Sequence, residues 1–154
     1  MAIRILFIFA IVLFTGCASN PMVVAPQQEL QKPLNNESQV IFMRSSFLGS
    51  AINASLYDVT NGDISFVGVI ANGTKVSYKT TPGIHVFMVV SEAADFMEAS
   101  LDSGKNYFSI TTPRMGLWKA RFSLWPIKND QNAKYHTGMP EFNNWINDTK
   151  LVDN

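Results

Sequence analysis

Residues 82–90, with the sequence PGIHVFMVV, decide the fold class of this chain. Pro-Gly favours a turn, and the residues that follow are almost all apolar. In a β-strand, Ile84 and Val86 would face one side while His85 and Phe87 face the other, because successive side chains alternate. Both faces of such a strand would be mostly apolar, which predicts a position in the interior of a sheet.

Short strands and turns extend from this segment in both directions. Further apolar or alternating runs occupy residues 40–43, 52–57, 64–71, 76–78, 96–101, 107–112 and 118–125. Asn72-Gly73 is the strongest hairpin signal, since both residues tolerate a positive φ. Residues 38–127 lack a helical period, so the spacing predicts an all-β fold, a small antiparallel β-sandwich of about seven or eight strands.

The last of these runs, residues 118–125, alternates between an apolar side and a side with two cations. Trp and Arg are favoured anchors of protein interfaces. This pattern predicts a partner surface made of Arg114, Trp118, Lys119, Arg121 and Trp125. The alternative is an ordinary exposed strand face with Trp118 in the core.

Residues 128–154 form a polar tail that ends in a predicted short helix. Pro140 suits the first turn of a helix, and Phe142, Trp145 and Ile146 have the i, i+3, i+4 spacing of one helical face. We expect this apolar stripe to pack back on its own domain, with docking to a partner as the alternative.

The N-terminal flank of the predicted sandwich reads as a flexible tether. Residues 17–37 contain Pro21, Pro26 and Pro33 among several Gln and Asn residues, and they lack periodic apolar spacing. Such a composition is typical of an extended linker. The sandwich itself is therefore expected over residues 38–127.

Residues 1–16 have the layout of an export signal. Arg4 precedes the apolar run Ile5–Phe14, and small residues follow it. The uncharged stretch is shorter than the roughly 20 residues that a membrane-spanning helix needs. Cys17, the only cysteine, comes directly afterwards.

The sequence around Cys17 resembles the signal-peptide end of a bacterial lipoprotein, although Phe14 stands where that signal usually has Leu. The resemblance implies diacylglyceryl transfer to the thiol, cleavage before Cys17, and two or three acyl chains, which anchor stably in a bilayer. Residue 18 is Ala and not Asp. This pattern resembles that of lipoproteins sorted to the outer membrane, and it implies a location on the periplasmic face of that membrane. The alternative is a free cysteine behind an ordinary export signal.

Charge and cysteine content exclude several classes of function. The chain has 12 basic and 12 acidic residues, and loss of residues 1–16 removes only Arg4. Without a basic stripe, nucleic-acid binding is not supported. With Cys17 acylated no disulfide forms, and no cofactor motif is present.

The block from Val40 to Pro126 resembles short bacterial domains of unknown function that occur in lipoproteins and are similar to PEGA-like and carboxypeptidase-regulatory-like β-sandwiches. The matching segments are residues 40–44 (VIFMR), 72–74 (NGT), 81–85 (TPGIH), 103–108 (SGKNYF) and 113–122 (PRMGLWKARF). Ile84 replaces a basic residue that the family usually has. The resemblance implies a fold and a location, and no chemistry.

Candidate catalytic and metal-binding residues are few. Zinc needs three or four ligands, whereas the only histidines are His85 and His136. We expect the His85 ring to pack beside Phe87 with its nitrogens bonded to the backbone. Carboxylates gather at Glu92, Asp95 and Glu98, where a pair could serve glycoside chemistry but a solvated loop is expected. Asp58 and Asp63 lie with Asn61 near one turn and could touch calcium, but the 12-residue calcium-loop pattern is absent, so no metal site is predicted.

The sequence therefore favours a membrane-anchored envelope lipoprotein that acts as a binding or structural adaptor module, with the bilayer and an envelope protein as partners. One alternative is a module for a small ligand or glycan, which predicts a concave patch containing Trp125 or Tyr57. The least favoured is an envelope enzyme, which would need a pocket joining His85 to a carboxylate and a nucleophile.

Overall fold

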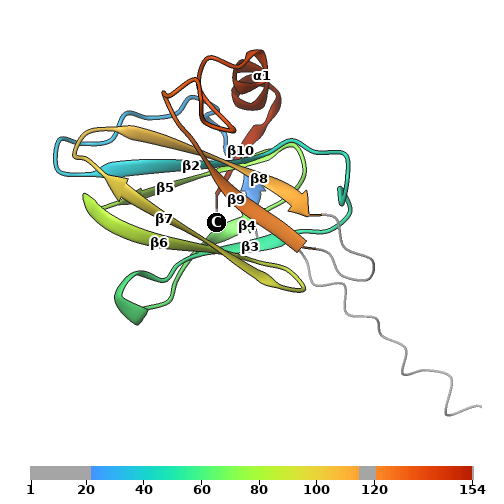
Figure 1. Ribbon diagram of the computed structural model, residues 1–154, viewed down its shortest axis with the longest axis horizontal. Coiled ribbons are helices and arrows are strands. Elements are labelled where there is room, and N and C mark those ends of the chain that lie inside the picture. Colours follow the sequence, from blue (N-terminus) through green and yellow to red (C-terminus); the bar gives the residue numbers. More distant parts are fainter. Residues whose placement is uncertain (1–21, 115–120, 154) are drawn as a thin grey trace, which may run out of the picture.

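The computed structural model describes residues 22–114 and 121–153. Its elements are two facing sheets and one C-terminal helix (Figure 1). The strands are β1 (Val23–Val24), β2 (Ser38–Arg44), β3 (Ala54–Asp58), β4 (Ser65–Ile70), β5 (Thr74–Thr80), β6 (Gly83–Val90), β7 (Ala94–Leu101), β8 (Asn106–Arg114), β9 (Arg121–Ile127) and β10 (Lys150–Asp153); a 3-10 turn, η1, spans Thr60–Gly62, and the helix α1 spans Pro140–Asp148.

The first sheet, which we call sheet A, has the strand order β1-β10-β5-β2-β8-β9, and the second, sheet B, has the order β4-β3-β6-β7. The all-β sandwich predicted from the sequence is thus confirmed. Most neighbouring strands run antiparallel as expected, but β2 pairs with β8 in parallel, and so does β10 with β5. A parallel pair joins strands that are distant along the chain, so hairpin signals do not reveal it.

The apolar strand β6 lies inside sheet B between β3 and β7, as predicted. His85, Phe87 and Val89 point toward the other sheet and are buried, whereas Ile84 on the opposite face is 65% exposed. The alternation of an extended strand produces this division.

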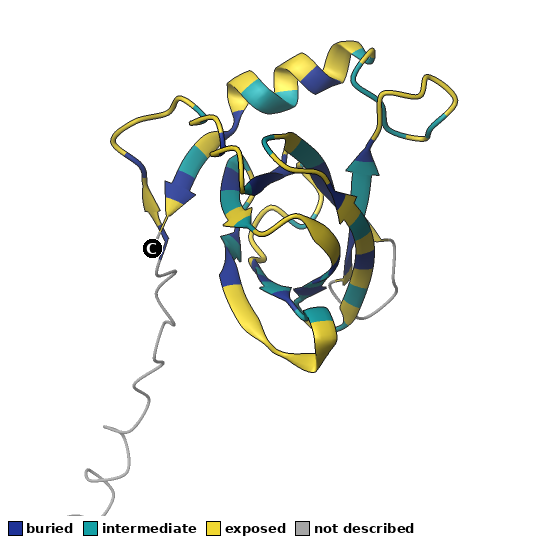
Figure 2. Cartoon of the chain, turned by 90° about the vertical axis from the view of Figure 1, so that its left-hand side faces the viewer, coloured by how far each residue is buried: buried dark blue, intermediate teal, exposed yellow. Residues whose placement is uncertain are grey.

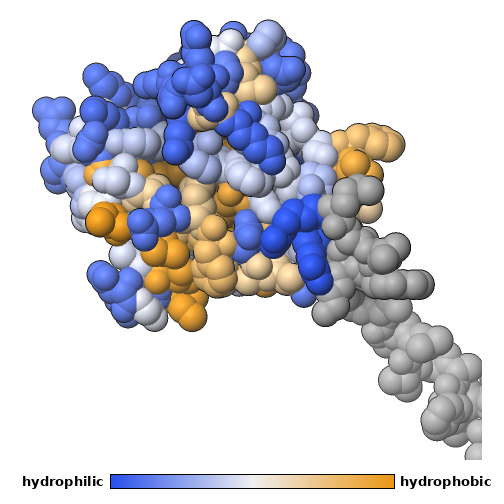
Figure 3. All heavy atoms as spheres, in the orientation of Figure 1, coloured by the Kyte–Doolittle hydropathy of each residue, from blue (hydrophilic) through white to orange (hydrophobic). Residues whose placement is uncertain are grey.

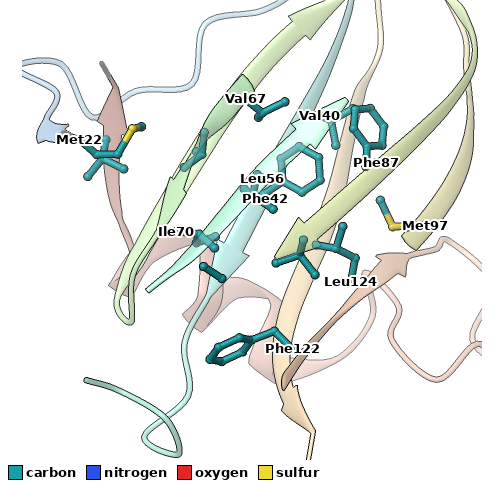
Figure 4. Close-up of a cluster of buried hydrophobic side chains, with 14 of the residues drawn as sticks. Met22, Val40, Phe42, Leu56, Val67, Ile70, Phe87, Met97, Phe122 and Leu124 are labelled. Atoms are coloured by element: carbon teal, nitrogen blue, oxygen red, sulfur yellow. The ribbon is translucent and has the colours of Figure 1, made fainter. Parts of the chain in front are cut away.

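The main core fills the space between the sheets (Figure 4). Phe42 of β2 meets Phe87 of β6 edge to face, with ring centroids 5.2 Å apart. Leu56, Ile70, Phe122 and Leu124 pack into the same cluster. Aromatic pairs in this geometry contribute beyond the area that they bury.

A second core lies on the outer side of sheet A, where α1 covers the strands (Figure 2). Ile41, Met43 and Ile110 are buried there beneath Phe142 of the helix. Trp145 and Ile146 pack against the same cluster. The predicted helix begins at Pro140, and its apolar stripe folds back on its own domain, as expected.

The segment from Met22 to Leu30 differs from the expected flexible tether. Met22 and Ala25 are buried, and the Ala25 N–H donates to the Leu151 carbonyl over 2.9 Å. We call residues 22–30 the N-terminal arm. Pro26 disfavours a helix in this segment but does not prevent it from lying along a sheet edge, so the ordered body starts before the predicted boundary at Ser38.

The arm and the tail complete the edge of sheet A together. β10 adds in parallel to β5, and β1 then pairs with β10, Val24 standing opposite Val152. The body therefore also continues past the predicted boundary at Ile127. Among the described helices, none is long and apolar enough to cross a membrane.

Candidate functional site

The predicted lipidation residue, Cys17, lies outside the described residues, as do Trp118 and Lys119 of the predicted partner surface. Arg114 and Arg121 are described. They stand opposite each other where β8 ends and β9 begins. Both are exposed, and the Arg114 guanidinium lies 3.2 Å from the Asp95 carboxylate of β7.

Trp125 belongs to a different environment. Its ring is half-buried on the outer side of sheet A, its indole N–H donates to the Thr112 hydroxyl over 3.1 Å, and the Lys134 ammonium lies 3.7 Å from the ring centroid. Tyr135 packs beside it. The chain's own tail thus contacts Trp125, whereas the side chains of Arg114 and Arg121 are exposed at the end of the sandwich.

His85 is the best-connected candidate for chemistry, and it stands at the start of β6 facing the core. Its ring stacks on Phe87 with an interplanar angle of 12°, as predicted. Nε2 lies 2.9 Å from the Thr81 carbonyl, which is the backbone contact expected. Nδ1 lies 2.9 Å from an oxygen of Asp58, a carboxylate partner that the sequence did not indicate.

The Asp58 carboxylate is held by more than His85. The Thr60 hydroxyl and backbone N–H both donate to its second oxygen. Burial by itself raises the pKa of Asp58, but the hydrogen bonds from Thr60 and His85 outweigh it and leave the pKa below its ordinary value. Burial and the nearby Asp58 charge raise the pKa of Tyr78.

This geometry gives the His85 cluster a structural role. A general base needs one ring nitrogen directed at a substrate, whereas Nε2 faces the Thr81 carbonyl and Nδ1 faces Asp58. The cluster ties β3, η1 and β6 together at one end of sheet B. Within the described ranges, no group of three His, Cys, Asp or Glu side chains is arranged to hold a metal ion.

Two buried cations were not found from the sequence. Arg44 ends β2 with no exposed surface; its guanidinium donates to the carbonyls of Gly49 and Ile52, each over 2.5 Å, and lies 4.1 Å from the Phe122 ring centroid. Burial lowers the pKa of Arg44. Arg44 thereby fixes the loop that connects β2 to β3, a contact that no local pattern signals.

Lys75 is the second buried cation, on the outer side of sheet A. Its ammonium donates to the carbonyls of Ile146 and Thr149 over 2.6 and 2.8 Å. These carbonyls end α1, where the helix dipole favours a positive charge. Burial lowers the pKa of Lys75. The alternation in β5 places Lys75 and Lys79 on the same face, but only the fold shows which of them is buried.

A cavity of about 520 Å³ separates the N-terminal arm from β5 and β10. Gln39 forms part of its wall; its side-chain N–H donates to the Ser77 hydroxyl over 2.6 Å, while its Oε1 is buried and has no hydrogen-bond partner. Trp125 and Tyr57, which the glycan interpretation placed in a concave patch, do not line this cavity.

The outer side of sheet B differs from that of sheet A, because no helix in the described part of the chain covers it (Figure 2). Phe66, Tyr57, Met88 and Phe96 are successive cross-strand partners from β4 to β7. We call these four residues the sheet B row. Hydrophobic residues gather over β6 and β7 (Figure 3), and Phe96 is 59% exposed.

Comparison with known proteins finds no match for this chain among protein-family models, curated proteins or solved structures.

Proposed function

We propose that this protein is a bacterial envelope lipoprotein, anchored through acyl chains on Cys17, whose β-sandwich acts as a binding or structural adaptor module. One observation carries the proposal: a short apolar run, two small residues and the only cysteine follow one another over residues 5–17. The resemblance to PEGA-like lipoprotein domains, and the outer-membrane location implied by Ala18, belong to the same proposal.

The His85 geometry supports an adaptor in preference to an enzyme. An enzyme would need a pocket that joins His85 to a carboxylate and a nucleophile. Instead, the two ring nitrogens of His85 face Asp58 and the Thr81 carbonyl. As the docking surface for an envelope protein we propose the end of the sandwich with Arg114 and Arg121, together with Trp118 and Lys119 of the connecting segment. Arg121 and Arg114 are available there as interface anchors.

Intact mass and pull-down from solubilised envelope, with wild type and Cys17→Ser side by side, test this proposal. We expect the wild type to lack residues 1–16, to have the added mass of acyl chains and to retain a partner. Cys17→Ser should have no lipid mass. A wild-type protein without lipid mass would overturn the anchoring, and the same partner recovered with Arg114→Ala/Arg121→Ala would overturn the proposed surface.

A small-ligand module is the second candidate, and the unpaired Gln39 Oε1 beside the 520 Å³ cavity favours it. Such an acceptor fits a ligand that donates an N–H or O–H group. Thermal unfolding with a panel of small amides and sugars tests it. A ligand that stabilises the wild type and not Gln39→Leu supports the site, and equal stabilisation of both excludes it.

A further inference from the structure

The sheet B row forms an uninterrupted apolar band across all four strands of sheet B. Tyr57 stands opposite Phe66 on one side and Met88 on the other, and Met88 stands opposite Phe96. The Tyr57 and Phe66 rings meet edge to face, with centroids 5.6 Å apart. Ile84, which is 65% exposed, extends the apolar surface along β6.

Charge is scarce on this face. The outward positions of β3, β6 and β7 alternate with the buried ones, and Glu98 is the only charged residue among them. A surface without cations gains nothing from anionic lipid or nucleic acid. Its ligand must therefore be recognised by apolar and aromatic contact.

The short connection between Cys17 and Met22 limits how far the proposed anchor can lie from this face. Met22 packs between the sheets, and its methyl carbon would be 3.0 Å from a Cβ placed on Gly68 of β4. Five residue steps separate Cys17 from Met22, and they span at most about 18 Å when fully extended. Phe66, at the β4 end of the row, is two residues from Gly68.

We propose that the outer face of sheet B lies on the lipid surface to which Cys17 is anchored, with Phe66, Tyr57, Met88 and Phe96 in contact with the interfacial region. This inference rests on the proposed lipidation of Cys17. Aromatic side chains and Tyr in particular suit the membrane–water interface, where a ring is buried and a hydroxyl stays hydrated. Shallow burial of apolar groups adds to the anchoring by the acyl chains.

The exposed area favours a lipid surface over a second copy of the chain. Phe66, Ile84 and Phe96 are 44, 65 and 59% exposed. Since a large side chain buries at most about 150–250 Å², these three offer roughly 250–420 Å². A stable dimer buries about 800 Å² per partner. A tethered domain needs far less, because the anchor already holds it at the surface.

A single fluorescent label tests this orientation in the full chain. Acylation would consume the only native thiol, so Phe96→Cys provides one labelling position on sheet B, and Asn143→Cys provides a matched position on the exposed side of α1. Each lipidated variant is labelled with an environment-sensitive dye and reconstituted into phosphatidylcholine vesicles. We expect a blue shift at position 96, with loss of intensity when the lipids are brominated, and neither effect at position 143.

The outcomes separate this inference from the proposed function. Lipid mass on the protein with no quenching at position 96 would overturn the orientation and leave the anchoring intact. A blue shift at position 96 that grows with protein concentration and is insensitive to bromination would assign the face to a second copy, which also overturns it. Without lipid mass the anchoring itself fails; quenching at position 96 in Cys17→Ser/Phe96→Cys at high vesicle concentration would then show that the face binds lipid unaided.

A double variant provides an independent test that uses no label at position 96. Phe66→Ser/Tyr57→Ser removes the half of the row that lies on β3 and β4, and Thr80→Ser serves as a control on sheet A. With the fold verified by circular dichroism, we expect the unlipidated double variant to lose the vesicle binding that the unlipidated control retains. Equal vesicle binding by both chains would overturn the role of the row.

Discussion

At the scale of single residues, the sandwich depends on buried polar side chains that have specific partners. Arg44, Lys75 and Asp58 are all buried, and backbone carbonyls, a histidine and a threonine bond to them; of these groups, the Arg44 Nε has no hydrogen-bond partner among the described residues. A buried polar group without a partner is costly, whereas one that is fully bonded fixes a single arrangement. Lys75 and Asp58 each join segments that are remote in the sequence, and Arg44 joins a loop to the strand that precedes it.

Asp58 makes the stability of the protein depend on pH. Because hydrogen bonds from Thr60 and His85 hold the pKa of Asp58 below its ordinary value in the folded state, its contribution to stability is present above the unfolded pKa and is lost as the pH falls through the lower folded value. We expect Asp58→Asn to reduce the free energy of unfolding at pH 7 by about 1–3 kcal/mol. Urea unfolding between pH 7 and pH 3 measures this difference.

The matched control for Asp58 is Asp63→Asn, an exposed residue beyond the same turn. It should leave the free energy of unfolding nearly unchanged at every pH. The gap between wild type and Asp58→Asn should narrow below about pH 4, where the unfolded carboxyl is protonated. A gap that stays constant down to pH 3 would contradict the assigned role of the charge.

At the scale of elements, α1 depends on a cation from the sheet beneath it. The helix is only two and a half turns long at 3.6 residues per turn, and isolated helices of such length are marginal in water. Phe142 buries its apolar side, and Lys75 binds the carbonyls of Ile146 and Thr149 at its end. Packing and capping together, more than helix propensity, determine its stability.

Replacing Lys75 by Met should loosen the helix and the strand after it. The variant keeps an apolar stem but leaves two carbonyls unbonded, so we expect a loss of about 1–3 kcal/mol. Hydrogen exchange of amides in α1 and β10 should become faster relative to those of β6. Lys79→Met, an exposed position on the same face of β5, is the control, and unchanged exchange in Lys75→Met would refute the capping role.

At the scale of the whole molecule, the two sheets have different surroundings. The tail and helix cover the outer side of sheet A, while the N-terminal arm and β10 extend its edge. Sheet B has its row of apolar side chains on the surface. The sandwich thus presents two unlike faces, and we have assigned the uncovered one to lipid.

Removal of the tail should expose the second core. A chain ending at Ile127 loses α1 and β10, which leaves Ile41, Met43 and Ile110 without their cover. Because large exposed apolar patches promote association, we expect it to bind a hydrophobic dye and to elute as aggregate in size-exclusion chromatography. A monomeric chain with the wild-type unfolding midpoint would show instead that the body does not need residues 128–154.

The sequence by itself determined the local features of this protein. Alternation and turn residues predicted β2 to β9, the interior position of β6 and the helix beginning at Pro140, since each depends on neighbours a few residues apart. His85 was placed beside Phe87 for the same reason. The signal before Cys17 is also local, and it supports the proposed anchoring.

Only the tertiary structure decided which distant segments meet. The parallel pairing of β10 with β5 and the docking of Met22 follow from a free strand edge and a gap between the sheets, which exist only after the chain has folded. Asp58 beside His85 and Lys75 beneath α1 likewise join residues from separate elements. Burial is a property of the assembled core. No periodic pattern along the chain therefore shows which cation, or which terminal segment, the core buries.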